Sequence, residues 1–462
     1  MSSYNMQEIR RTALSFISFL NASPSPYHAT HRCCQLLSAA GFAERSEAES
    51  WTIKPLDKVF VTRNKSTVIA FAVGGNWKPG NGFSIVGAHT DSPCFKVKPR
   101  SKLGSGGCLQ LGVMPYGGGI WRSWFDRDLT VAGRVMVKTQ NDTVEHRLIH
   151  IADPIMTIPN LPIHLDTERD VHKHNKETHL RPIMATEYIE KLLNGGDAKT
   201  KETEKRHNHH STFMERVARE AQCTVDDIVD FELYVCDTQP ARLVGLHEEF
   251  ISGPRLDNLV GSYTAVTGLI DSQDLDKDPN VRMVCCFDNE ECGSESAQGA
   301  MSSITEWIMR RINAGYCEKN NVSSVAFEEC IPKSLLLSAD QAHALHPNYQ
   351  EKYDEENRAK FHEGIVVKIN ANQRYATTSI THTMLKLIAE KASVALQAFV
   401  VRNDSLCGST IGPILSSKLG LPTIDIGTTQ LAMHSVRELA DISGVAHAKM
   451  LYKVSLVMRI FE

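Results

Sequence analysis

The sequence predicts an α/β protein in which a mostly parallel sheet is flanked by helices, with a second, β-rich domain inserted into the first. Short apolar runs that end in polar residues alternate with segments whose apolar residues recur at helical spacing. Between about residues 95 and 250 this alternation stops, and glycine-rich, strand-like segments replace it. We therefore expect a discontinuous first domain over 1–94 and 251–462, and an inserted domain over 95–250.

The amino-acid composition limits the classes of protein to which this chain can belong. Hydrophobic residues make up 42 % of the 462 residues and charged residues 23 %, which is enough apolar material for a folded core. The net charge of −4 lacks the basic excess that nucleic-acid binding requires, so we expect no nucleic-acid partner. No apolar run approaches the ~18 residues of a membrane span. The twelve cysteines contain no CxxC pair, which favours reduced thiols and a cytoplasmic protein. Arg10 and Arg11, ahead of an apolar run, leave a secretory leader as the alternative.

The elements of the first domain follow from periodicity. Strands are expected at five short apolar runs, namely Phe83–Ala88, Val281–Phe287, Leu335–Ser338, Ala398–Arg402 and Thr423–Ile426. Helices are expected where apolar residues recur at helical spacing, namely Ile9–Asn21, Ala29–Ala40, Asn258–Ile270, Ser294–Asn313, Ile380–Ser393, Ser409–Leu419 and Ser443–Ile460. Alternating strands and helices of this kind place functional side chains at the carboxyl ends of the strands.

The inserted region has a different pattern of residues. Residues 104–119 and 129–138 are strand-like. Residues 198–211 form a polar run without apolar periodicity, which predicts a flexible, solvated loop. Its histidines, His207, His209 and His210, leave metal binding as an alternative for this run.

Polar residues follow several of the predicted strands or begin the next helix. They are His89, Asp91, Asp257, Glu290, Glu291, Asp340 and, in a later loop, His434. One histidine at a strand end is commonly only a hydrogen-bonded structural residue, and an aspartate beside it commonly caps a turn. Two imidazoles together with several carboxylates form instead a nitrogen and oxygen ligand set that suits Zn²⁺, Mn²⁺ or Co²⁺. The number of candidate ligands fits a pair of ions.

Six segments resemble the aspartyl aminopeptidases, in order and over nearly the whole chain. They are GAHTDSP (87–93), RLDNLVG (255–261), FDNEECGSES (287–296), SADQAHALHPNY (338–349), CGSTIGP (407–413) and MHSVRE (433–438). The resemblance implies two divalent metal ions per chain, zinc above all, with manganese or cobalt as alternatives. By this resemblance His89, Asp257 and Asp340 hold one ion, while Asp257, Glu291 and His434 hold the second.

The neighbouring carboxylates suggest two further roles. Metal coordination lowers the pKa of water from about 15.7 to about 7, which makes a nucleophile available at neutral pH. Glu290 is the natural general base, because adjacent residues in an extended chain point in different directions and Glu291 is taken as a ligand. Asp91 lies two residues after His89, on the same side of an extended backbone, and is placed to accept the imidazole N–H.

The resemblance also implies a substrate and an assembly. A preference for N-terminal Asp or Glu needs a cation in the side-chain pocket, and the resemblance assigns Lys368, with His343 and Tyr375 as further substrate-binding candidates; spacing alone favours an ordinary solvated lysine. It places His164 in the active site of a neighbouring subunit and the inserted domain in oligomerisation, within a homododecamer that admits peptides.

We therefore expect a metallo-aminopeptidase that removes N-terminal acidic residues from peptides. The alternatives are a related metal-dependent amidase or carboxypeptidase, and a non-catalytic oligomeric binding protein.

Overall fold

The computed structural model describes residues 5–193, 208–316 and 323–458. The chain forms two compact units. The first consists of Met1–Ser92, Ala241–Met433 and Glu438–Glu462, and the second of Pro93–Pro240 and His434–Arg437. The first unit is therefore assembled from segments that are far apart in the sequence.

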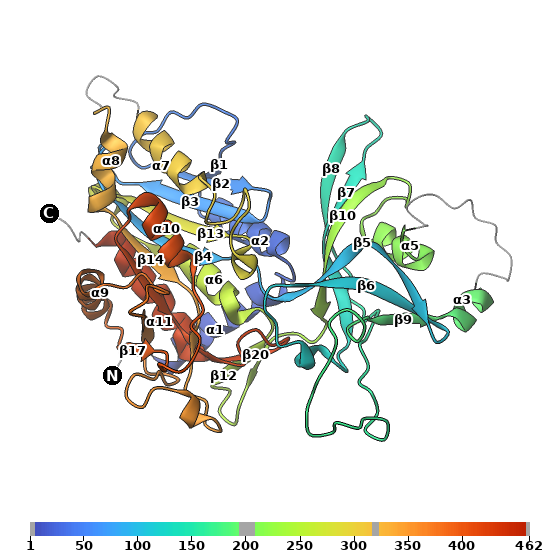
Figure 1. Cartoon of the computed structure of the whole chain (residues 1–462). Coiled ribbons are helices and arrows are strands. Elements are labelled where there is room, and N and C mark those ends of the chain that lie inside the picture. The colour runs from blue at the N-terminus through green and yellow to red at the C-terminus, as the bar shows by residue number, and fades with distance from the viewer. Residues whose placement is uncertain (1–4, 194–207, 317–322, 459–462) are drawn as a thin grey trace. The chain divides into compact units, whose positions relative to one another are not determined.

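A nine-stranded sheet forms the centre of the first unit (Figure 1). In spatial order its strands are β1 (Ala43–Glu44), β2 (Lys58–Arg63), β3 (Thr67–Val73), β13 (Val281–Phe287), β4 (Phe83–His89), β14 (Leu335–Ala339), β18 (Thr423–Gly427), β16 (Ile365–Ile369) and β17 (Leu396–Val400). The four strands β13, β4, β14 and β18 are mutually parallel, whereas β3 and β16 run antiparallel to them. All residues of β4 and β13 are buried, which explains their nearly continuous apolar sequences.

Helices cover both faces of this sheet (Figure 1). One face packs against α1 (Met6–Asn21), α2 (Pro26–Ala39), α6 (Leu256–Asp271), α9 (Ser379–Ala392) and α11 (Ile442–Val457). The other packs against α7 (Ile304–Ala314), α8 (Ala326–Cys330) and α10 (Ile411–Leu419). Strand β4 shows the alternation that this requires, because Val86 and Ala88 enter the first core whereas Phe83 and Ile85 enter the second.

A small five-stranded sheet completes the first unit. Its order is β11 (Arg242–Val244), β12 (Phe250–Gly253), β20 (Glu438–Asp441), β19 (Thr429–Leu431) and β15 (Ala342–His343). The last residue of β20, Asp441, is also the N-cap of α11, and its carboxylate accepts a hydrogen bond of 2.7 Å from the Gly444 N–H.

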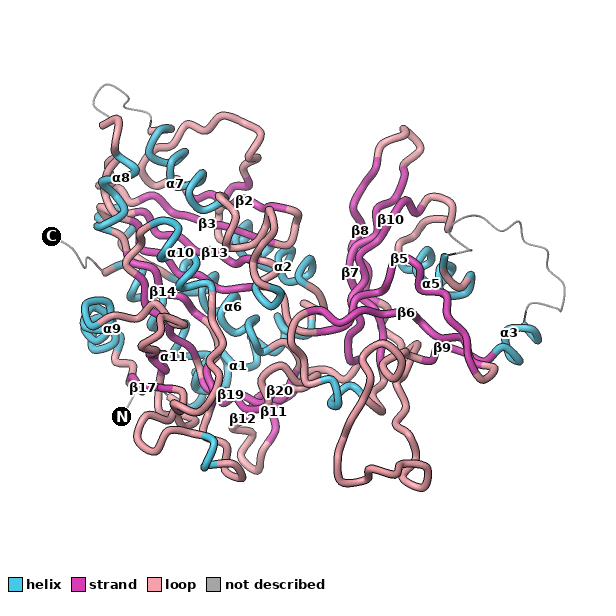
Figure 2. The backbone as a smooth tube through the Cα atoms, in the orientation of Figure 1, coloured by secondary structure: helices cyan, strands magenta, loops and turns pink. Residues whose placement is uncertain are grey.

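The second unit is β-rich, as Figure 2 shows by its long strands. Its antiparallel six-stranded sheet has the order β8 (Val144–His150), β7 (Leu129–Lys138), β10 (Ile228–Asp237), β5 (Cys94–Ser105), β6 (Cys108–Tyr116) and β9 (Ile183–Thr186). Helix α5 (Ser211–Glu220) adds Phe213, Met214 and Val217 to the core of this unit. Helix α3 (Glu187–Leu193) has no buried residue.

The structure corrects one predicted helix and adds a hairpin. Of the helix predicted over 294–313, only α7 is helical, because the preceding residues form turns that begin at Ser294, whose φ is +61°. The strands β2 and β3 form an antiparallel hairpin that apolar periodicity did not predict. The helix predicted to end at Ile460 ends at Val457, and residues 459–460 lie outside the described residues. Among the described helices, none combines the length and apolar character needed to cross a bilayer.

Candidate metal and active site

The candidate site lies at the C-terminal ends of three central strands of the large sheet, β4, β13 and β14. In the parallel register His89 is opposite Phe287, and Gly87 is opposite Ser338. The three strands therefore stop at nearly the same level. Their continuations bring together His89, Glu290, Glu291 and Asp340, and the start of α6 adds Asp257.

His89 is the centre of this cluster and is only 1 % exposed. Its Nε2 lies 3.3 Å from Asp257 Oδ1, 3.6 Å from Asp340 Oδ1 and 3.8 Å from Glu290 Oε2. Its Nδ1 is 3.1 Å from the carbonyl oxygen of Asp91, an acceptor, so Nδ1 carries the proton. The other ring nitrogen, Nε2, is then the basic atom and faces the carboxylates, as a metal ligand requires.

Asp91 links His89 to the loop after β13. Its carboxylate is fully buried and lies 3.3 Å from His89 Nδ1. It also accepts hydrogen bonds from the backbone N–H groups of Glu290 and Glu291, at 3.2 and 3.0 Å. The two glutamates form the short 3₁₀ turn η3 (Glu290–Cys292), which begins after Asn289, a residue with φ of +64°. Asp91 therefore fixes the histidine and the backbone of both glutamates at once.

Asp257 is positioned by the irregular beginning of α6. Asp257 and Asn258 have non-helical backbone angles, and the peptide bond between them is cis. The Asp257 N–H donates to the Glu438 carboxylate at 3.0 Å, and the Ser92 hydroxyl donates to the Asp257 carbonyl at 2.6 Å. The Asn258 amide donates to the carbonyl of Ala339, next to Asp340, at 2.7 Å. These contacts join the start of α6 to the ends of β4 and β14.

The cluster concentrates negative charge in a buried place. Burial raises the pKa of the Glu290 carboxyl above its usual range, and the charges of Asp340, Asp91 and Asp257 raise it further, against the opposing effect of His89. Burial opposes a charge on His89, but the surrounding carboxylates raise the pKa of its imidazole well above the ordinary value. Asp340 Oδ1 is buried without a hydrogen-bond donor among the described residues. Such a set of oxygens around one imidazole fits divalent cations.

One cation of the chain borders the cluster. Lys368, on β16, is 3 % exposed, and its Nζ lies 3.4 Å from Asp340 Oδ2. The Tyr375 ring centre lies 5.5 Å from the same Nζ. The expectation from spacing alone, a solvated lysine, is wrong, because this side chain is almost entirely buried.

Three predicted residues, His343, His164 and His434, come from other segments of the chain. His343, on β15, is exposed, and its ring centre lies 5.7 Å from that of Phe399. His164 is exposed in the second unit. His434 belongs to the short segment 434–437 of the second unit, where its Nδ1 lies 2.8 Å from the carbonyl oxygen of Gly118. That contact assigns the proton to Nδ1 and leaves Nε2 as the basic nitrogen of His434.

The histidines at the end of the polar run have structural contacts in the second unit. His207 lies outside the described residues. His209 is 7 % exposed, and its Nδ1 lies 2.8 Å from the Ser101 hydroxyl. His210 Nε2 lies 2.8 Å from the carbonyl of Leu103. The prediction of a solvated loop is therefore wrong for His209, because its ring is buried near the start of α5, where its centre lies 5.0 Å from that of Phe231.

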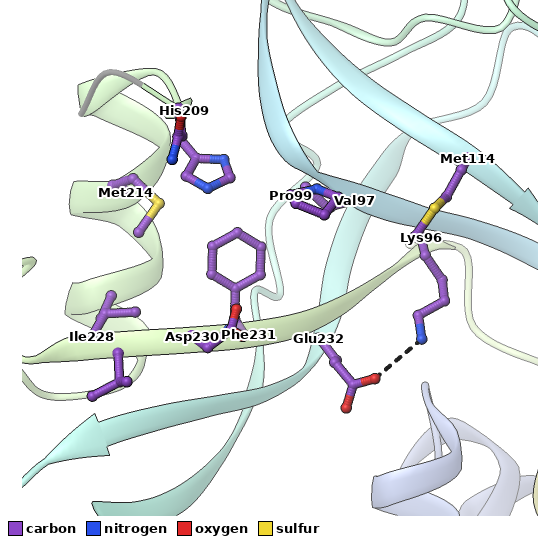
Figure 3. Close-up of a pocket in the computed structure, with 12 residues that line it drawn as sticks. Lys96, Val97, Pro99, Met114, His209, Met214, Ile228, Asp230, Phe231 and Glu232 are labelled. Atoms are coloured by element: carbon purple, nitrogen blue, oxygen red, sulfur yellow. Dashed lines mark hydrogen bonds and ion pairs between the residues drawn. The ribbon is translucent and has the colours of Figure 1, made fainter. Parts of the chain in front are cut away.

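His209 borders a cavity of about 540 Å³ between α5, β5 and β10 (Figure 3). Two of its lining charges form a pair, because Lys96 Nζ lies 3.3 Å from Glu232 Oε1. The described residues that line this cavity contain no cluster of metal-ligand side chains.

Sequence reasoning missed two buried acids near the cluster. Glu438 holds the backbone of Asp257, and Asp425, in β18, is fully buried. A charged residue inside the apolar run of Thr423–Gly427 was the available signal for Asp425.

Comparisons with known proteins identify the family of this chain. Residues 19–455 match the family described as aminopeptidase I zinc metalloprotease (M18). An aspartyl aminopeptidase of Caenorhabditis elegans is 53 % identical over 96 % of this chain and 95 % of that protein. An aspartyl aminopeptidase of Aspergillus oryzae is 46 % identical over 98 % of this chain and 97 % of that protein.

Solved structures extend the comparison to the fold. A cryo-EM structure of the Ape4 and Nbr1 complex matches with a TM-score of 0.92 at 42 % identity, over 98 % of this chain and 87 % of that one. A Saccharomyces cerevisiae mApe1 dodecamer matches with a TM-score of 0.83 at 26 % identity, over 96 % and 95 % of the two chains. The resemblance carried by the six motifs is confirmed, and the chain belongs to the M18 family of zinc metallo-aminopeptidases.

Proposed function

We propose that this enzyme is a two-metal aminopeptidase that removes N-terminal acidic residues from peptides. The observation that carries the proposal is the buried cluster of His89 with Asp257, Glu290, Glu291 and Asp340, whose ligand atoms lie within 4.8 Å of one another in two overlapping groups. The names of the aspartyl aminopeptidase relatives support the acidic preference.

The first ion site consists of His89, Asp257 and Asp340. Three observations fit it: the basic Nε2 of His89, the buried Asp340 Oδ1 without a donor among the described residues, and a hard oxygen and nitrogen ligand set. The second site consists of Asp257, Glu291 and His434, with Asp257 shared between the ions. When bound, divalent zinc supplies Lewis acidity, which polarises the scissile carbonyl and makes water acidic near neutral pH.

Glu290 is the general base in this proposal. Its backbone is fixed by Asp91, while its carboxylate is partly open at 15 % side-chain exposure and lies beside the cluster. The Glu290 carboxylate accepts a proton from water at Oε2 and returns it to the leaving amine. Asp91 keeps the His89 tautomer and therefore acts as a positioning residue.

Lys368 provides the charge that recognises the acidic side chain. Its ammonium is buried next to the proposed metal ligand Asp340, where a carboxylate of the first substrate residue gains a charge-assisted hydrogen bond in a low-dielectric site. Tyr375 adjoins this ammonium and forms part of the same pocket. We assign His343 to the outer wall of the site and His164 to the site of a neighbouring subunit.

We further propose a homododecamer in which the second unit serves oligomerisation. The similar mApe1 structure is a dodecamer, and the second unit exposes large apolar side chains, including Leu161, Ile163 and Leu165. The described cysteines are all free thiols, which is typical of the cytoplasm, and we propose that the enzyme works there.

The decisive test is Glu290→Gln, assayed with a panel of aminoacyl reporter substrates. The variant keeps the shape of the side chain but removes the proton acceptor, so we expect turnover to fall by about a hundredfold or more, with about two zinc ions per chain retained. Metal content is measured by mass spectrometry. The matched control is Glu295→Gln, an exposed acid of the same loop, which should keep full activity.

Full activity of Glu290→Gln would contradict its role. Cleavage of N-acylated or carboxy-terminal substrates by the wild type, without release of N-terminal Asp or Glu, would instead favour an amidase or carboxypeptidase. Absence of any chelator-sensitive hydrolysis would favour a binding protein.

A further inference from the structure

We propose that Asp425 is the positioning residue that holds Lys368 in place for the acidic side chain of the substrate. This inference rests on the proposed function and goes beyond it, because Asp425 lies in none of the six motifs. It starts from the register of the sheet. Ser338 is opposite Gly87 on one side and opposite Asp425 on the other.

The antiparallel pair of β18 and β16 continues this row. Val366 is opposite Gly427 and Val367 is opposite Ile426, so the next step of the register places Lys368 opposite Asp425. Residues that are directly opposite on neighbouring strands project to the same face of a sheet and interact. The two charges are both buried, at 3 % exposure for Lys368 and none for Asp425.

Hydrogen-bond donors hold the Asp425 carboxylate in place. The Ala376 N–H donates to its Oδ2 at 2.6 Å, and the Thr410 hydroxyl lies 2.5 Å from its Oδ1. Burial raises the pKa of this carboxyl, while the hydrogen bonds from Thr410 and Ala376 and the charge of Lys368 act in the opposite direction. Gly412 leaves room for this carboxylate, because the Cβ of any other residue at that position would overlap the carboxylate oxygens.

Asp425 connects the segments that border the pocket. Ala376 follows Tyr375, whose ring adjoins the Lys368 ammonium, and Thr410 is the N-cap of α10. One carboxylate therefore fixes the backbone beside Tyr375 and the beginning of α10, and the register places it opposite the lysine. The same side chain therefore holds the backbone that borders the pocket and lies opposite, in the register, the lysine that gives the pocket its positive charge.

The lysine needs this second carboxylate for a physical reason. A buried ammonium is costly without an opposite charge, and the other acidic neighbour of Lys368 is Asp340, which we assign to metal binding. Without Asp425 the ammonium would turn fully to Asp340. Asp425 thus keeps Lys368 available to the substrate carboxylate.

The test compares N-terminal Asp with N-terminal Ala substrates in the metal-loaded variant Asp425→Asn. We expect kcat/KM for the Asp substrate to fall on the order of tenfold or more, mainly through a higher KM, with a change below about threefold for the Ala substrate. Inhibition by free L-aspartate should weaken by a similar factor. The ratio between substrates does not depend on the folded fraction, so a purely structural defect leaves it unchanged.

Two further variants keep the test decisive if Asp425→Asn folds poorly. Thr410→Val removes one hydrogen bond to Asp425 and should lower the Asp/Ala ratio, whereas Thr410→Ser retains the hydroxyl and should restore it. Asp278→Asn is the matched control, because Asp278 is also buried and pairs with Arg282 at the opposite end of β13. It should leave the ratio unchanged.

The outcomes separate this inference from the proposed function. If the wild type shows no preference for N-terminal Asp, the proposed specificity fails. If the wild type prefers Asp and both Asp425→Asn and Thr410→Val keep that preference, the role of Asp425 is refuted while the proposed function stands.

Discussion

Four carboxylates surround His89, and they lie so close together that their negative charges repel one another strongly in the protein interior. Asp91, Asp257, Glu290 and Asp340 all lie within 3.8 Å of this one imidazole. Their mutual repulsion lowers the stability of the metal-free protein, and backbone donors compensate for part of it at Asp91. The residues are therefore arranged for a positive partner rather than for their own stability.

Replacement of Glu291 by Gln tests this interpretation. A neutral amide is a poorer zinc ligand, so bound metal should fall below two ions per chain, while the midpoint of thermal unfolding of the chelated protein should rise by about 2 °C, as one repulsive charge is lost. Mass spectrometry and calorimetry provide the two values. Glu295→Gln should change neither, and a lower midpoint of chelated Glu291→Gln would contradict the repulsion.

Among individual residues, the sequence predicted the candidate site residues that lie at or just after the ends of strands. His89, Glu290 and Asp340 follow apolar runs, and the parallel register then brings them together. Asp425 was missed because it lies within an apolar run, where periodicity treats a charge as an exception. Its contacts come from Ala376 and Thr410, whose proximity depends on tertiary packing.

Strand β18 approaches the backbone at the end of β14 closely. The Asp340 N–H donates to the Ile426 carbonyl at 2.9 Å. A Cβ at the next residue, Gly427, would overlap the Asp340 carbonyl oxygen. The backbone that presents Asp340 is thus supported directly by the backbone of the neighbouring strand.

Gly427→Ala should therefore separate these strands. We expect a destabilisation of about 1–3 kcal/mol, because the overlap is with backbone that shifts only together with its strand, and a loss of bound metal through displacement of Asp340. Denaturant unfolding and metal analysis measure the two effects. Gly408→Ala is the control, since no atom lies within 4 Å of the added Cβ, and equal stability of the two variants would contradict the close approach.

The bounds of helices and strands were predicted well where the apolar periodicity is strong. They were predicted poorly where local backbone geometry determines where an element begins. Strands β4, β13 and β18 and helices α6 and α9 lie close to their predicted ranges. The turns before α7 escaped prediction because the left-handed backbone at Ser294 carries no hydrophobic signal. The hairpin of β2 and β3 consists of short apolar runs whose period does not identify a pairing partner.

For the whole molecule, the exposed apolar side chains of the second unit indicate self-association. Leu161, Ile163 and Leu165 are 60, 61 and 68 % exposed within five residues of one another. Exposed apolar groups so close together are unfavourable in water and are commonly covered by a partner. We expect a second copy of this chain to cover them.

Joint replacement of Ile163 and Leu165 by Asp should weaken the assembly. Light scattering should give about 620 kDa for the wild type, twelve times the 51.4 kDa of one chain, and a smaller mass for the variant, because charges oppose burial at an interface. Leu56→Asp, which alters a single exposed apolar residue of the first unit, should keep the wild-type mass. An unchanged mass of the double variant would exclude this segment from the interface.

Strand β4 lies between β13 and β14, which the ribosome makes about 200 and about 250 residues later. During synthesis the strand that bears His89 emerges long before either neighbour, and β18, which supports Asp340, emerges later still. A nascent chain therefore cannot complete the sheet around His89 and Asp340 before β18 has emerged.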